Sequence, residues 1–407
     1  MKPMGPIPAD FRARGGALLI GGQKASALAE RAGETPLFVY DIAMVEARIA
    51  RFRTAFPSID LHYALKANPF AALVHRIVPL VDGIDVASGG EARAATEAGM
   101  AGFCVSFAGP GKRDAELEFA IHQGITINLE SENEAARALA VGARIGVRPR
   151  LAVRVNPEFE LRGSGMRMGG GAKPFGVDAA RVPALARRIV AEGAEFRGFH
   201  IFAGSQSLDA DAIVEAQTAT VALAARLAEE AGAAPPRLNL GGGFGIPYFA
   251  GDSPLDIERI GAALEARYRD RPAALADTRF CLELGRWLVG EAGVYLTRVV
   301  DRKESGGQIF LIVDGGLHHQ LAASGNFGAV VRRNYPIAVA DRFGAESEEV
   351  ANVCGCLCTP LDRLGDQVAV PRAQVGDLIA IFLAGAYGAS ASPSAFLGHG
   401  PAQEVLV

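Results

Sequence analysis

The sequence of 407 residues predicts an α/β protein in which a (β/α)8 barrel is joined to a mainly β domain. Three observations support this fold class. Eight short apolar runs occur before Gly285, and amphipathic stretches rich in Ala, Arg and Glu lie between them. After Gly285, apolar segments alternate with Gly and Pro turns and show little helical periodicity. The first pattern is typical of βα units around a parallel sheet, and the second is typical of a β domain.

The predicted barrel extends over residues 39–284. Its strands are the eight apolar runs at residues 61–65, 83–87, 103–106, 125–129, 151–155, 198–202, 238–240 and 280–284. Its helices include the amphipathic stretches at residues 91–98, 114–123, 132–141, 180–191 and 209–231. Eight strands with intervening helices favour a closed (β/α)8 barrel, and a doubly wound sheet of eight strands is the alternative.

The predicted β domain consists of residues 1–38 and 285–407. Before the barrel, the short apolar run at residues 17–20 is the candidate strand. After the barrel, the candidate strands are residues 287–300, 308–313, 349–356, 377–383 and 404–407. A chain of this length also fits two domains better than one.

Composition and charge exclude several classes of protein. Hydrophobic residues make up 50% of the chain and charged residues 21%, which is enough apolar material for a folded core. The formal net charge is −4 and no basic tract is present, so nucleic acid is not an expected partner. Residues 1–16 lack the apolar core of a signal peptide, and no apolar run reaches the roughly 18 residues of a membrane span, so no membrane partner is expected.

Five cysteines bear on the compartment and on metal binding. An odd number of cysteines without a leader segment favours free thiols in a reducing cytoplasm. Cys354, Cys356 and Cys358 alternate, so on a strand they would face one side. Because no fourth ligand follows at a standard spacing, we expect small buried side chains there and no metal. A catalytic proton donor among them is the alternative.

Polar residues follow several predicted strands, at the end where barrel enzymes hold their catalytic groups. Lys66 ends the first apolar run and is one of six lysines, and the other five lie in polar, loop-like contexts. We therefore expect Lys66 to be partly desolvated, which would favour the free amine that a Schiff base needs. A structural lysine whose stem packs on apolar neighbours is the alternative.

Two further features suggest a phosphate-bearing cofactor. The Gly-rich segment 241–245 places closely spaced N–H groups at a predicted strand-to-helix turn, which suits a phosphate; a plain Gly-rich turn is the alternative. Glu283 lies in an apolar segment and needs a partner, either a pyridinium N–H or an ion pair with Arg286 or Arg154. A phosphate site and a Schiff-base lysine together are what pyridoxal phosphate requires.

Taken together, these residues resemble the fold-type III pyridoxal-phosphate decarboxylases, which include diaminopimelate, ornithine and arginine decarboxylases. The resemblance extends from Phe38 to Tyr387 and rests on seven ordered motifs: YALKAN (63–68), DVAS (85–88), GSQ (204–206), NLGGGFG (239–245), ELGR (283–286), Cys358 with Asp362, and AYG (386–388). It implies an alanine racemase-like barrel with a β domain, and a head-to-tail homodimer with shared active sites. Glu283 favours decarboxylation over racemisation, because alanine racemase is known for an arginine at that place.

The resemblance also implies a role for each matching residue. Lys66 would carry the cofactor as a Schiff base, and Cys358 would reach the partner subunit's site and return a proton to the α-carbon. The other residues expected to bind the cofactor are Asp85, Arg154, Phe202, Ser205, Gly242, Gly243, Glu283, Arg286 and Tyr387. Of these, Glu283 would bind the pyridine nitrogen, and the phosphate would be held by Ser205, Gly242, Gly243 and Tyr387. Those expected to bind the substrate are Arg286, Arg332, Arg333 and Asp362.

Departures from the family pattern bear on the substrate. Phe202 stands where diaminopimelate decarboxylases usually have a histidine stacked on the cofactor ring, and His200 lies two residues earlier. Thr359 and Pro360 replace a glutamate that contacts the far amino group of the substrate, which argues against free diaminopimelate.

Residues 163–171 and 325–336 are similar to a narrower subgroup, namely decarboxylases near exosortase and exopolysaccharide gene sets and an enzyme acting on carrier-protein-bound glutamate. Arg332 and Arg333 would meet an anionic substrate or a phosphopantetheine arm, and solvated surface arginines are the alternative.

The leading hypothesis is a decarboxylase that uses pyridoxal phosphate and removes the α-carboxylate of an amino acid or of an amino-acid derivative. The alternatives are diaminopimelate decarboxylase itself, a non-catalytic binding or regulatory protein of the same fold, and a barrel that binds another phosphate ligand. Lys66, Glu283 and Cys358 argue against the non-catalytic alternative.

Overall fold

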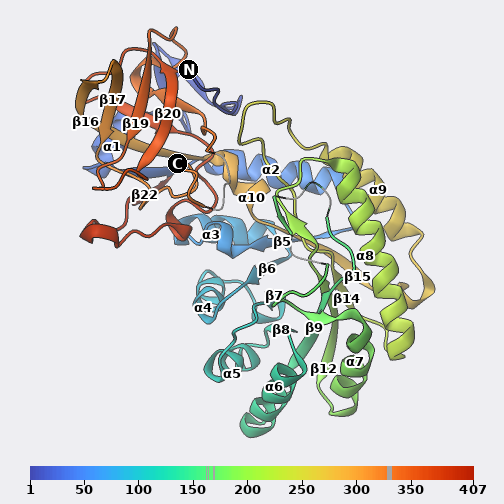
Figure 1. Cartoon of the computed structure of the whole chain (residues 1–407). Helices are drawn as coiled ribbons and strands as arrows, with labels where there is room; N and C mark the ends of the chain where they lie inside the picture. The colour runs from blue at the N-terminus through green and yellow to red at the C-terminus, as the bar shows by residue number, and fades with distance from the viewer. Residues whose placement is uncertain (162, 164, 168–169, 328–331) are drawn as a thin grey trace. The chain divides into compact units, whose positions relative to one another are not determined.

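The computed structural model describes residues 1–161, 163, 165–167, 170–327 and 332–407. The chain divides into two compact units (Figure 1). The barrel unit consists of Arg48–Gly245 and Pro254–Gly285, and the β unit consists of Met1–Ala47, Ile246–Ser253 and Arg286–Val407. The β unit thus includes residues 39–47 and 246–253, which the sequence placed in the barrel.

Eight parallel strands close into a barrel, which confirms the predicted fold class and excludes the doubly wound alternative. In order around the barrel they are β5 (Asp60–Ala64), β6 (Gly83–Val86), β7 (Val105–Phe107), β8 (Thr126–Leu129), β9 (Arg150–Asn156), β12 (Glu195–Ile201), β14 (Arg237–Asn239) and β15 (Arg279–Leu284). The barrel closes where β15 pairs with β5. Each strand coincides with a predicted apolar run, because both ends of a barrel strand are flanked by polar turns.

Helices surround the barrel strands in Figure 1. The five predicted helices are present as α4 (Gly89–Glu97), α5 (Asp114–His122), α6 (Glu132–Ile145), α7 (Val182–Ala191) and α8 (Ala210–Ala231). Ser88, Ser131 and Asp209 cap three of them by accepting backbone N–H groups of the first turn. The sequence did not predict α2 (Ile42–Ala55), α3 (Ala71–Ile77) or α9 (Ile257–Arg269).

The β unit is built around a sheet whose central strand is β16 (Gly293–Ser305). The other strands of this sheet are β4 (Leu37–Tyr40), β17 (Gln308–Val313), β18 (Ile337–Val339), β19 (Glu349–Cys354), β20 (Arg363–Val370), β21 (Leu378–Ile381) and β22 (Gln403–Leu406). A second, three-stranded sheet consists of β1 (Arg12–Arg14), β2 (Ala17–Ile20) and β3 (Gln23–Lys24), and α1 (Ala25–Ala32) follows it.

The mainly β character of this unit is confirmed, with one local correction. The predicted strand at residues 287–300 begins instead with a short helix, α10 (Arg286–Val289), and a 3-10 turn before β16 starts. The apolar residues of that segment are buried in either conformation, so hydrophobicity alone did not reveal the helix. The strands β4, β18 and β20 of the sheet around β16 were not predicted.

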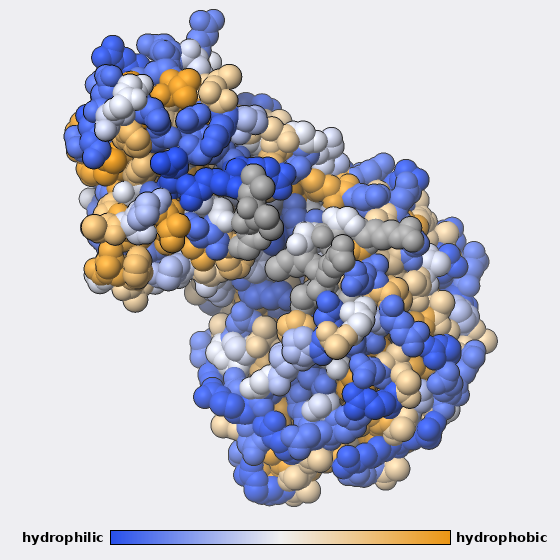
Figure 2. Space-filling model, in the orientation of Figure 1, coloured by the Kyte–Doolittle hydropathy of each residue, from blue (hydrophilic) through white to orange (hydrophobic). Residues whose placement is uncertain are grey.

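Apolar side chains fill the interior of each unit. The face of the barrel unit that Figure 2 shows is mainly hydrophilic, with scattered apolar residues. Among the helices that the structure describes, none combines the length and the apolar character needed to cross a membrane.

One carboxylate links the N-termini of two barrel helices. Glu116 accepts hydrogen bonds from the backbone N–H groups of Gly89, at 2.8 Å, and Arg113, at 2.9 Å. Burial acts to raise the pKa of Glu116, but these donors and the Arg113 guanidinium outweigh it and lower the pKa from 4.5 to about 2. Because the pKa is lower in the folded chain, the stabilisation is present above about pH 4.5 and is lost as the pH falls toward about 2.

Replacing Glu116 with Gln should therefore lower the free energy of unfolding by about 1–2 kcal/mol at neutral pH. The difference from the wild type should shrink on acidification, because below about pH 4.5 the carboxyl group binds a proton in the unfolded chain more readily than in the folded chain. Urea unfolding at neutral pH and at about pH 3 measures both effects. Glu118→Gln is a matched control, because Glu118 forms only a partly exposed ion pair with Arg144. A difference that does not change with pH would contradict this account.

Candidate active site

A cavity of about 210 Å³ lies at the carboxyl ends of the barrel strands. The predicted site residues that line it are Lys66, Asp85, Arg154, Phe202 and Glu283. These residues come from five different strands or the turns that follow them, so the closed barrel brings together side chains that are far apart in sequence. His200 and Phe175 complete the polar and aromatic part of the lining.

Lys66 lies in the 3-10 turn Leu65–Ala67 that directly follows β5. Its side chain is exposed, with Nζ 5.5 Å from the centroid of the Phe202 ring. The expected desolvation of Lys66 is therefore wrong for the chain alone. The turn leaves the sheet before residue 66, so the side chain reaches the open cavity and not the apolar core.

Glu283 is buried at the inner side of the cavity and contacts two side chains. Its Oε2 lies 3.0 Å from His200 Nε2 and accepts a hydrogen bond from Asn239 Nδ2 at 3.2 Å. An ion pair with Arg286 or Arg154 was the alternative to a pyridinium partner, and in this structure Glu283 pairs instead with His200. Burial acts to raise the pKa of Glu283, but the charges of His200, Lys66 and Arg154 outweigh it, so the pKa is lowered and the carboxylate is ionised.

A chain of polar contacts continues from Glu283 toward the other end of the barrel. Asn239 also donates to Asp85 Oδ1 at 3.4 Å, and Asp85 Oδ2 lies 2.9 Å from His62 Nδ1. Arg237 Nη1 lies 2.8 Å from His62 Nε2. Because Arg237 can only donate, Nε2 of His62 accepts, and the ring therefore donates its proton from Nδ1 to Asp85. Asp85 is in this way held as a hydrogen-bond acceptor in the lining of the cavity.

A second buried network holds Arg154. Its Nη1 lies 2.7 Å from Glu130 Oε1, and its guanidinium lies 5.0 Å from the centroid of the Phe175 ring. Burial acts to raise the pKa of Glu130, but Arg154 and neighbouring donors lower it. Nearby, Lys112 is buried and donates to Glu134 at 2.6 Å, which corrects its expected loop-like, polar setting.

The two segments predicted to hold the phosphate lie next to each other in the barrel unit. Ser205, in β13 (Gly204–Ser205), is followed by Ser207, whose N–H donates to the carbonyl oxygen of Gly243 at 2.9 Å. A Cβ atom at Gly242 would come within 2.0 Å of the carbonyl oxygen of Glu283, so this approach requires glycine. The next helix after the Gly-rich segment is α9, which begins only at Ile257. The prediction that this segment forms a strand-to-helix turn is therefore wrong.

In the β unit, Arg286 and Tyr387 lie together. Arg286 Nη1 donates to the Tyr248 hydroxyl at 2.8 Å, and the guanidinium lies 4.7 Å from the centroid of the Tyr387 ring. Tyr387 has a φ of 56°, a conformation that few residues other than glycine adopt. Tyr248 was missed by the sequence analysis, because it follows the Gly-rich segment without any local signal.

The loop between β19 and β20 carries Cys358, which is exposed. Asp362 is buried, and its two carboxylate oxygens accept hydrogen bonds from the backbone N–H groups of Leu317, at 2.6 Å, and Leu357, at 2.9 Å. Asp362 therefore fixes the loop around Cys358. Cys356 is half-buried, so the expectation that the alternating cysteines are small buried residues is wrong.

Arg332 and Arg333, which belong to the segment 325–336 that is similar to the narrower subgroup, differ in their surroundings. Arg332 is half-buried and its Nη2 donates to the carbonyl oxygen of Leu361 at 3.3 Å. Arg333 is exposed, with its guanidinium 3.8 Å from the centroid of the Phe249 ring. Several residues of the two subgroup segments, at 164, 168–169 and 328–331, lie outside the described part of the chain.

Comparison with known proteins gives concordant matches. Residues 42–290 match the family model described as "Pyridoxal-dependent decarboxylase, pyridoxal binding domain". The chain is 37% identical over 380 residues to L-glutamyl-[BtrI acyl-carrier protein] decarboxylase of Niallia circulans, covering 92% of this chain and 89% of that protein. It is 34% identical over 402 residues to diaminopimelate decarboxylase of Methanothermobacter thermautotrophicus, covering 96% and 91%. Diaminopimelate decarboxylase of M. jannaschii in complex with L-lysine has a TM-score of 0.89 at 26% identity, covering 99% and 94%.

Proposed function

The chain belongs to the pyridoxal-dependent decarboxylase family, and from that premise we propose that it decarboxylates an amino-acid substrate carried on an acyl-carrier protein. Membership of the family makes it an enzyme that uses pyridoxal phosphate. The catalytic part of the proposal rests on one observation. Lys66, with its amine, and Glu283, with its ionised carboxylate, line the same cavity.

The residues of this cavity fit pyridoxal phosphate. Lys66 supplies the amine for covalent attachment, and Phe202, next to that amine, supplies a flat apolar face for the pyridine ring. We assign the stacking role to Phe202, which stands at the position where diaminopimelate decarboxylases have the stacking histidine and lines the cavity with Lys66. Ser205 and the Gly-rich segment 241–245 of the barrel unit would supply donors for the phosphate. When bound, the cofactor stores the electron pair that the departing carboxylate leaves behind.

Glu283 in the cavity and Cys358 in the β unit would then have definite tasks. The Glu283 carboxylate would accept the pyridine N–H and keep that nitrogen protonated, with His200 and Asn239 orienting the carboxylate. Cys358 Sγ donates the proton that replaces the lost carboxylate on the α-carbon. Cys358 is exposed in the single chain, which supports a head-to-tail homodimer in which it serves the partner subunit's site.

The substrate proposal rests on residues near Cys358. Thr359 and Pro360 leave no carboxylate to hold the far amino group of free diaminopimelate. Arg332 donates to Leu361 of the same loop, so a cation lies beside the segment that carries Cys358. A phosphopantetheine arm carries a phosphate that would match Arg332 and Arg333, and the Niallia circulans relative acts on a glutamyl carrier protein.

A substrate panel tests this proposal directly. Release of carbon dioxide should be faster from glutamate bound to an acyl-carrier protein than from free glutamate or meso-diaminopimelate. The relatives named diaminopimelate decarboxylase make that substrate the second candidate. If meso-diaminopimelate is decarboxylated efficiently and carrier-bound glutamate is not, the second candidate replaces the first.

Removing both arginine charges should weaken recognition of the carrier-bound substrate. In the double variant Arg332→Gln, Arg333→Gln, we expect the KM for carrier-bound glutamate to rise about tenfold, with kcat within about twofold. The loss of affinity follows from losing two cations near an anionic arm. Arg372→Gln, at an exposed arginine of the β unit, is the control. An unchanged KM in the double variant would contradict the proposal that Arg332 and Arg333 bind the phosphate of the phosphopantetheine arm.

A further inference from the structure

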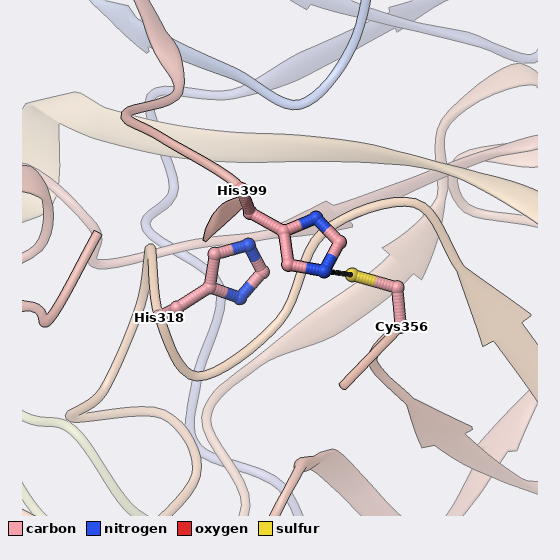
Figure 3. Close-up of side chains that lie close together, drawn as sticks. All are labelled: His318, Cys356 and His399. Carbon is pink, nitrogen blue, oxygen red and sulfur yellow. Dashed lines mark hydrogen bonds between the residues drawn. The ribbon is translucent and has the colours of Figure 1, made fainter. Parts of the chain in front are cut away.

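Three side chains of the β unit, none of which the proposed reaction uses, converge at one place: His318, Cys356 and His399 (Figure 3). They come from three separate loops, one after β17, one between β19 and β20, and one before β22. Their potential ligand atoms all lie within 4.8 Å of one another, and Cys356 Sγ is 3.9 Å from His399 Nε2.

His318 provides the second observation. Its side chain is fully buried, and neither ring nitrogen has a hydrogen-bond partner in the described part of the chain. The neighbouring His319 differs, because its Nδ1 lies 3.1 Å from the Tyr295 hydroxyl and its Nε2 donates to the carbonyl oxygen of Gly400 at 2.9 Å. A buried polar atom without a hydrogen-bond partner is unfavourable, so a ligand that engages the ring nitrogens of His318 would be favoured.

We propose that His318, Cys356 and His399 bind a zinc ion. Two imidazoles and a thiolate are typical zinc ligands, and three protein ligands leave a fourth position for water. Tetrahedral zinc with ordinary bond lengths separates its ligand atoms by roughly 3.4–3.6 Å. The Cys356–His399 pair, at 3.9 Å, is already close to this separation, and the other pairs, within 4.8 Å, require side-chain rotation to close around the ion. On binding, the Cys356 thiol releases its proton to solvent, and the sulfur donates an electron pair to the metal.

The surroundings favour a cation at this position. The carboxylate of Asp362 is close enough for its charge to act on both Cys356 and His399. His399 is exposed, which gives an ion access from solvent. His318 and His399 also pack together, with ring centroids 4.9 Å apart, so one ion can reach both rings.

The position of Cys356 suggests what the metal does. Cys356 lies two residues before Cys358, and Asp362 holds the same loop from its other end. A metal at Cys356 would tie this loop to the segments of His318 and His399. If Cys358 is the proton donor, a role that rests on the proposed function, zinc would fix the loop that presents it.

Metal analysis of the untagged full-length protein tests the site. After zinc loading and dialysis, we expect about one zinc per chain by mass spectrometry, and at least about tenfold less in Cys356→Ser and in His318→Gln. Cys354→Ser and His122→Gln are the matched controls and should retain the metal, since Cys354 lies two residues away and His122 is exposed on α5. Circular dichroism verifies that each variant is folded.

Cobalt provides a second readout that does not depend on activity. The difference spectrum between cobalt-loaded and zinc-loaded protein should show a thiolate-to-cobalt band, present in Cys354→Ser and absent from Cys356→Ser. Zinc-loaded wild type without bound metal, or Cys356→Ser with the wild-type zinc content and cobalt band, would overturn the proposal. Either result leaves the proposed decarboxylation untouched, because neither measurement involves turnover.

Discussion

Lys66→Ala is expected to abolish covalent attachment of pyridoxal phosphate and to reduce kcat by at least about 10³-fold. Lys66 is the lysine that lines the cavity with Glu283, and the five other lysines of the chain are not among the residues that line it. Its exposed amine can reach the cofactor without rearrangement of the barrel. The absorbance spectrum before and after borohydride reduction, followed by peptide mapping, measures the attachment.

Lys24→Ala is the matched control, because Lys24 is an exposed lysine of β3 in the β unit. It should retain the cofactor band, the borohydride-trapped peptide and the activity of the wild type. A cofactor band of wild-type intensity in folded Lys66→Ala would show that another group holds the cofactor. The assignment of Lys66 would then be wrong.

Glu283→Gln should reduce kcat by about 10²–10³-fold while the protein still binds the cofactor. Glutamine keeps the size of the side chain but cannot hold a proton on the pyridine nitrogen by charge. Because the pKa of Glu283 is lowered, the wild-type carboxylate is ionised throughout the neutral range. The wild-type rate should therefore show no loss from titration of Glu283 near neutral pH, and such a loss is expected only in strong acid. Steady-state kinetics across pH checks both statements.

The control for this change must also remove a buried carboxylate. Glu265→Gln meets that need, because Glu265 is buried in α9 and accepts the backbone N–H of Ser58 at 2.8 Å, away from the cavity. It should lower stability with little effect on kcat. Glu283→Asp should recover part of the rate, since it restores the charge. If Glu283→Gln retains the wild-type kcat, the carboxylate does not act on the cofactor ring.

Much of the barrel is predictable from local sequence. Each strand is a short apolar run bounded by polar residues, and this pattern repeats eight times. The predicted helices are amphipathic and begin at polar caps, so their limits are local properties of the chain. In contrast, α10 was predicted as a strand, because burial of a short apolar segment does not distinguish helix from strand.

The main site residues are also recognisable in the sequence, since barrel enzymes hold their chemistry at the carboxyl ends of strands. Lys66 and Glu283 both follow this rule, as does Arg154. His200 is recognisable in the same way, because side chains two residues apart on a strand face one side and Phe202 was already a candidate. Five of the residues that line the cavity were thus candidates from the sequence, whereas Phe175 was added only by the structure.

The partners of these residues were decided only by the tertiary structure. Glu283 pairs with His200 and not with an arginine, Lys112 is buried against Glu134, and Lys66 is exposed. The same holds for His318, Cys356 and His399, which lie on three loops of the β unit. A hydrogen bond or an ion pair depends on distances of a few tenths of an ångström between segments far apart in the chain. Strand register and loop path set those distances, whereas local hydrophobicity sets only which segments become strands and helices.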